Sequence, residues 1–108
     1  MRHHFWLVTV LLLSIAAPAA ADRRADAKAH VDFGNAVAQR GLWREAAARW
    51  QQAVELDPSY AAAWNNLGIG CEQLGRFDDA RKAYEKALEL TEQEPERRFL
   101  RQRIEQLK

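Results

Sequence analysis

The chain is poor in the residues that make disulfides, metal sites and β-sheets. Its 108 residues include one cysteine, three histidines and three prolines. A lone cysteine excludes a disulfide within the chain, so a small domain must be held together by packing alone. Valine, isoleucine and threonine are sparse beside alanine, leucine, glutamate and arginine, and this composition favours helices over strands.

An excess of charge of one sign is missing as well. Sixteen lysines and arginines stand against fifteen aspartates and glutamates, which gives no bulk field to attract nucleic acid. Spacings typical of zinc or haem sites, such as C-x-x-C and H-x-x-x-H, do not occur, and neither does a glycine-rich phosphate loop. We therefore expect no nucleic acid partner, no metal ion and no cofactor.

The start of the chain predicts an export signal. Arg2 precedes a largely apolar run at residues 5–17, and an A-x-A pattern of small residues ends at Ala21. The run is shorter than the ~18 residues that a membrane-spanning helix needs. We predict a signal peptide at residues 1–21 and a mature domain at 22–108. The domain is then exported, with the periplasm the preferred compartment; secretion or an uncleaved membrane anchor facing the periplasm are the alternatives.

An internal repeat of 34 residues dominates the mature region. Residues 27–60 align with residues 61–94 without a gap. The identical pairs are Ala27 with Ala61, Ala29 with Ala63, Gly34 with Gly68, Gln39 with Gln73, Gly41 with Gly75, Ala46 with Ala80, Ala53 with Ala87, Glu55 with Glu89 and Leu56 with Leu90.

The period and its pattern resemble the tetratricopeptide repeat, a helix–turn–helix unit. The second block carries the W-x-x-L-G opening of that family at Trp64, Leu67 and Gly68, followed by an aromatic at Tyr84. In the first block, His30 stands where the tryptophan is expected. The resemblance implies an all-α fold, a short α-solenoid of two repeats at 27–60 and 61–94. A solvating capping helix at 95–108 would end it.

Regularly spaced small residues explain how the helices could pack closely. We expect Gly34 and Gly68 to let the two helices of each repeat approach, with Ala46 and Ala80 facing them. Gly41 and its equivalent Gly75 should end the first helix of each repeat in a left-handed conformation, which costs glycine little.

The predicted helices cover residues 26–40, 44–56, 60–74, 77–91 and 96–107. Pro58 interrupts the middle of this series, and Ser59 can cap the helix that follows. The last helix has an apolar stripe at Leu100, Ile104 and Leu107 and an arginine-rich opposite face. That face could bind an acidic partner, an anionic lipid surface or nucleic acid, but we favour the solvated surface of a cap.

The resemblance also implies a binding surface, the concave face lined by the first helix of each repeat. Asparagine and glutamine on such a face can pair with both N–H and C=O groups of an extended peptide. The alternative is an ordinary polar face. The candidate groove residues are Lys28, Val31, Asn35, Gln39, Asn65, Ile69, Glu72 and Gln73.

One subgroup of the family grips a C-terminal carboxylate with lysines, an arginine and asparagines. Asn35 and Asn66 fall on its asparagine positions, but Val31, Glu96 and Leu100 occupy its basic positions. The charges of that clamp are missing, so binding of this type is not predicted.

Catalysis would have to use His30 and Cys71, and both fall on positions where we favour core packing. We therefore predict a non-catalytic protein–protein interaction module of the cell envelope. The alternative is a self-associating structural subunit, with homo-oligomers as its product. An enzyme is a third, disfavoured hypothesis, and a cross-link between two chains through Cys71 is disfavoured because burial is expected there. Contact with a membrane is expected only through an uncleaved signal segment.

Overall fold

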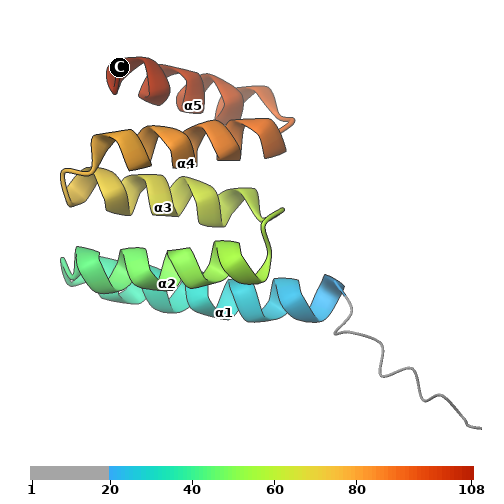
Figure 1. Cartoon of the computed structure of the whole chain (residues 1–108). Helices are drawn as coiled ribbons and strands as arrows, with labels where there is room; N and C mark the ends of the chain where they lie inside the picture. Colours follow the sequence, from blue (N-terminus) through green and yellow to red (C-terminus); the bar gives the residue numbers. More distant parts are fainter. Residues whose placement is uncertain (1–19) are drawn as a thin grey trace, which may run out of the picture.

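The computed structural model describes residues 20–108, which form an α-solenoid of five helices stacked in adjacent pairs (Figure 1). Each helix packs against the next in the chain, and the first also touches the third. Among residues 20–108, none of the helices combines the length and the hydrophobicity that a membrane span requires. The predicted signal segment lies outside the described residues except for its last two. The helices are α1 (Ala20–Gln39), α2 (Trp43–Leu56), α3 (Ala61–Gln73), α4 (Phe77–Leu90) and α5 (Glu94–Gln106).

The all-α class and the helix series are confirmed, and α2, α3 and α4 agree with their predicted bounds to within a residue. The last helix starts two residues early, with Pro95 accommodated in its first turn. The prediction for the first helix was wrong at its start, because α1 begins at Ala20 rather than near Asp26. The residues in between are ordinary helix formers with no glycine or proline to stop the helix.

Both glycines that follow a first helix adopt the expected left-handed conformation, with φ of 75° at Gly41 and 74° at Gly75. The Leu42 N–H donates to the Val37 carbonyl at 3.1 Å, and the same bond recurs 34 residues later. This 6→1 bond closes each helix end in a Schellman motif. The turn inside each repeat is thus built twice in the same way.

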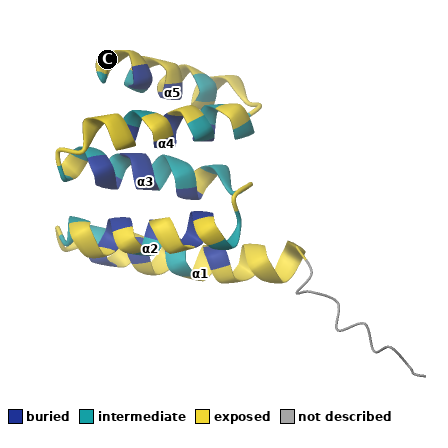
Figure 2. Ribbon diagram, in the orientation of Figure 1, coloured by how far each residue is buried: buried dark blue, intermediate teal, exposed yellow. Residues whose placement is uncertain are grey.

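Small side chains and two large rings make the core. Ala46, Ala53, Ala80 and Ala87 are fully buried, and buried residues occur on all five helices, whereas the first turns of α1 are exposed (Figure 2). A Cβ added at Gly34 would lie 2.5 Å from Trp50 Nε1, and one added at Gly68 would lie 2.6 Å from Tyr84 Cε1. The nearest neighbours of the two glycines are therefore aromatic rings, rather than the alanines that we predicted.

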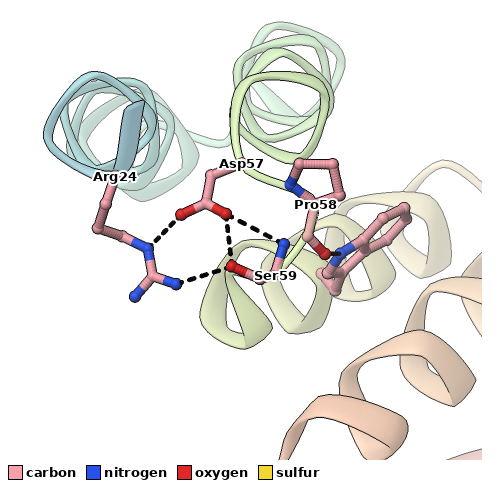
Figure 3. Close-up of polar contacts among 5 residues, drawn as sticks. Arg24, Asp57, Pro58 and Ser59 are labelled. Carbon is pink, nitrogen blue, oxygen red and sulfur yellow. Dashed lines mark hydrogen bonds and ion pairs between the residues drawn. The ribbon is translucent and has the colours of Figure 1, made fainter. Parts of the chain in front are cut away.

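Arg24 stabilises the turn between the two repeats through contacts with Asp57 and Ser59 (Figure 3). Its guanidinium pairs with the Asp57 carboxylate and donates to Ser59 Oγ at 3.3 Å. The same carboxylate accepts the Ser59 N–H at 3.1 Å and the Ser59 hydroxyl at 2.6 Å. Hydrogen bonds from Ser59 and then from Arg24 outweigh the desolvation of Asp57 and hold its pKa below the usual range.

The predicted role of Ser59 as a helix cap was wrong. The residue at the N-cap of α3 is Tyr60, which makes no side-chain cap bond. Ser59 instead completes the turn around Asp57, since a short hydroxyl side chain readily bonds within its own turn. On the other side of the turn, Trp64 Nε1 donates to the Pro58 carbonyl at 2.8 Å and ties α3 to it.

Candidate functional site

The first helix of each repeat, α1 and α3, and the capping helix α5 make one face of the stack, which we call the A-helix face. The second helices, α2 and α4, make the B-helix face. On the A-helix face a cleft of about 720 Å³ lies between α3 and α5, and we call it the A-helix cleft. Its apolar walls come from α3, from the end of α4 and from α5. They consist of Ala61, Ala62, Leu90, Pro95, Phe99 and Leu100.

Asn65 on α3 lines this cleft and has an unpaired polar atom. Its side-chain Oδ1 is buried and has no hydrogen-bond partner, and among the described residues no other buried side-chain nitrogen or oxygen is in that state. An unsatisfied buried acceptor costs about 1–3 kcal/mol, so such groups are normally matched by a donor. The N–H of an extended peptide lying in the cleft would be a suitable donor once a rotation of the Asn65 side chain exposes Oδ1 to it.

Acidic and aromatic side chains complete the lining. Glu92 and Glu96 are exposed, and neither belongs to an ion pair within residues 20–108. The Phe99 side chain is large, apolar and 48% exposed. The arrangement suits a segment that offers a backbone donor, an apolar side chain and a neighbouring positive charge.

Several predicted groove residues bond within the A-helix face. Asn35 accepts a hydrogen bond from Asn66 Nδ2 at 3.0 Å, which joins α1 to α3. Lys28 pairs with Asp32 at 2.9 Å, and this partner raises the pKa of the lysine. Gln39 and Gln73 are exposed at the last residues of α1 and α3.

Other predicted groove residues belong to the packing. Val31 is only 5% exposed, which corrects its assignment to the binding surface, and its carbonyl accepts the Trp50 Nε1–H at 3.3 Å. Ile69 is partly buried against the core. Glu72 accepts the Tyr84 hydroxyl at 2.6 Å and pairs with Arg103 of α5. Burial and this carboxylate raise the pKa of Tyr84.

A family model of the tetratricopeptide repeat matches residues 31–95, more than half of the chain. The chain belongs to the tetratricopeptide repeat family. Within this family the 34-residue echo, the paired helices and the glycine–aromatic contacts are one repeating unit, seen here twice in full.

Curated proteins with similar segments are much longer than this chain. The cytochrome c-type biogenesis protein CycH of Bradyrhizobium diazoefficiens is 42% identical over 48 residues, which cover 44% of this chain and 13% of that protein. Protein O-mannosyl-transferase TMTC1 is 33% identical over 75 residues in Homo sapiens and 34% over 74 residues in Mus musculus. Each TMTC1 match covers 68% of this chain and 8% of that protein.

The sequence analysis missed most of the α5 side of the cleft. Continuing the tetratricopeptide register beyond residue 94 places Glu96 and Phe99 at positions two and five of a third, partial repeat. Those positions face the binding surface in this family, so the register itself was the signal.

The residues considered for catalysis lie in different surroundings. His30 Nδ1 is 3.5 Å from Arg49 Nη1 on α2. Cys71 is 3% exposed, as predicted, and burial raises the pKa of its thiol, which disfavours the reactive thiolate. The described residues contain no cluster of side chains suited to a metal ion.

Two arginines of α5, Arg97 and Arg103, hold that helix against the rest of the fold, while Arg101 pairs within the helix. Arg97 donates to the Leu88 carbonyl at 2.9 Å and to the Thr91 carbonyl at 2.6 Å. Arg101 pairs with Glu94 at 3.0 Å, and Arg103 pairs with Glu72. The predicted apolar stripe faces the core, where Leu100 and Ile104 are buried. These contacts favour the capping role over a binding role for the arginines.

Proposed function

We propose that the chain is a non-catalytic interaction module of the cell envelope that binds an extended peptide segment of a protein partner in the A-helix cleft. The observation that carries the proposal is the unpaired Oδ1 of Asn65, a residue that lines that cleft. Membership of the tetratricopeptide repeat family supports a protein partner. The expectation of an exported, periplasmic module rests on the predicted signal segment.

The lining of the cleft defines the class of peptide. A backbone N–H would donate to Asn65 Oδ1, and an apolar side chain would lie against Phe99. A lysine or arginine next to it would be attracted by Glu92 and Glu96. This preference is opposite to that of the carboxylate clamp, which the missing basic residues already argue against.

Photo-crosslinking tests the site without assuming a partner. A crosslinking phenylalanine analogue in place of Phe99 should capture a protein from the envelope fraction of the native host. The same analogue at Gln102, an exposed α5 residue outside the cleft, is the matched control. Capture from both positions alike, or from neither, would contradict binding in the A-helix cleft.

Self-association is the second candidate, and the exposed ring of Phe33 on α1 is the observation that favours it. Phe33 is 47% exposed, although the Arg49 guanidinium lies over its ring at 4.1 Å from the centroid. Light scattering at micromolar concentration separates the candidates: this one requires a dimer that Phe33→Ser dissociates. A monomeric wild-type chain rejects it.

A further inference from the structure

A second cleft, of about 710 Å³, lies on the B-helix face, and we call it the B-helix cleft. Its walls come from α2 and α4, and its floor comes from α3. Within residues 20–108, α2 and α4 do not contact each other, so α3 is reached between them. Trp64 and Leu67 of α3, and Leu74 directly after it, are the large apolar residues of its lining.

Small residues keep this cleft open. Ala47 and Ala48 on α2 and Ala83 on α4 stand where longer side chains would fill the space over α3. Gly70 allows α3 to approach α2 from below, because a Cβ there would lie 3.1 Å from Ala47 Cβ. The apolar floor is therefore broad enough for side chains from another molecule.

The rim of the B-helix cleft is positive. Arg44 and Lys82 have no ion pair among the described residues, and Lys86 pairs with Glu89 at 3.2 Å. The one carboxylate of the lining, Asp79, is held by Arg76 through bonds of 3.0 and 2.8 Å. The A-helix cleft has the opposite character, with carboxylates and no cation in its lining.

We propose that the B-helix cleft is a second binding site, occupied by an acidic amphipathic segment of a protein partner. Apolar side chains of that segment lie against Trp64 and Leu67, and its carboxylates face Arg44 and Lys82. Charge complementarity selects this occupant, because a cationic segment suited to the A-helix cleft would be repelled here. One chain could then join two segments of opposite charge on its two faces.

Selection from a phage-displayed library of random 16-residue peptides tests the proposal on the full chain. We expect an acidic, apolar class of peptides to emerge. The double variant Arg44→Glu, Lys82→Glu should weaken binding of this class at least ~10-fold, about 1.4 kcal/mol. The control Arg40→Glu, Arg98→Glu makes the same change of net charge at exposed residues outside the cleft and should leave binding within ~2-fold.

Chemical shifts locate the site independently of affinity. The acidic peptides should perturb the backbone amides of α2 and α4, and raising the salt concentration should weaken their binding. The proposal is overturned if no acidic class emerges, if the control variant loses as much binding, or if the shifts fall on α5. It is also overturned if only anionic phosphatidylglycerol vesicles bind in an Arg44-dependent way, or if the acidic peptides merely dissociate a dimer of the chain. Variants of Asn65 test the A-helix cleft separately.

Discussion

The two repeats solve the same packing problem with different rings. Trp50 and Tyr84 stand 34 residues apart, and each ring lies against the glycine of the first helix of its own repeat. Both rings are buried, with 3% and 0% exposure. The position of the ring is therefore set by the glycine beneath it, whichever aromatic residue occupies the slot.

The polar atoms of the two rings have different hydrogen-bond partners, and only those of the second repeat connect to the following helix. Trp50 donates to the Val31 carbonyl inside its own repeat. Tyr84 donates to Glu72, whose other oxygen accepts a bond from Arg103 of α5. The hydrogen bonds of the second ring therefore extend through Glu72 to the capping helix α5, whereas the hydrogen bond of the first ring stays within its own repeat.

The turns after the two repeats show a similar contrast. After α2, Arg24 reaches from the preceding helix α1 to a carboxylate, Asp57 (Figure 3). After α4, Arg97 reaches back from the following helix α5 to the carbonyls of Leu88 and Thr91. One turn depends on an ionised acid, and the other depends on neutral acceptors.

Removing either ring should have the largest effect. We expect Trp50→Ala and Tyr84→Ala each to lower the free energy of unfolding by about 3–5 kcal/mol, because each leaves a cavity over a glycine. Urea unfolding followed by circular dichroism measures both values. The equivalence of the two slots fails if one variant is destabilised by less than half as much as the other.

Filling the glycines should have the next largest effect. Gly34→Ala and Gly68→Ala add a methyl group that meets a ring at 2.5 and 2.6 Å, so we expect a loss of about 1–3 kcal/mol. In an open helix position the same change would stabilise the protein by roughly 0.5–1 kcal/mol. Gly70→Ala meets its nearest atom at 3.1 Å and should cost less. The ring contacts are contradicted if thermal unfolding shows a larger loss of stability for Gly70→Ala than for Gly34→Ala and Gly68→Ala.

The smallest expected effect is the loss of stability on changing Asp57, and its dependence on pH distinguishes the two turns. Asp57→Asn should cost about 0.5–1 kcal/mol at neutral pH, since its partner Arg24 is exposed and screened by solvent. The pKa of Asp57 is lower in the folded than in the unfolded chain. Its contribution is therefore full above an unfolded carboxyl pKa of about 4 and is lost as the pH falls through the folded pKa.

The comparison with Thr91, in the second turn, is the control for that measurement. Thr91 Oγ1 donates to the Ala87 carbonyl at 2.6 Å, a contact with no titrating group. The cost of Thr91→Val should stay constant between pH 7 and pH 3, while that of Asp57→Asn shrinks. Two parallel curves would show that Asp57 is not the acid-sensitive element.

Much of the fold could be predicted because the same local sequence signals occur at equivalent positions in both repeats. Glycine at Gly41 and again at Gly75 marks the same helix end, and both have the expected positive φ. The start of α1 could not be predicted, because it precedes the echo. The partner of Arg24 in the inter-repeat turn lies 33 residues away, so no local pattern announces it.

The candidate site was harder to predict, because sequence position does not settle exposure. Val31 and Asn65 occupy the same repeat position, yet Val31 is buried and Asn65 lines the A-helix cleft. Glu72 was assigned to the groove, but its carboxylate is engaged by a tyrosine one helix away and an arginine two helices away. These pairings depend on tertiary contacts that spacing alone does not show.

Asn65→Ala is the measurement that tests the central claim most directly. Because Asn65 Oδ1 has no partner among residues 20–108, the variant should unfold at the same urea concentration as wild type or a higher one. Its capture of the proposed partner should fall by at least ~10-fold. Capture at the wild-type level by the stable Asn65→Ala chain would contradict peptide binding in the A-helix cleft.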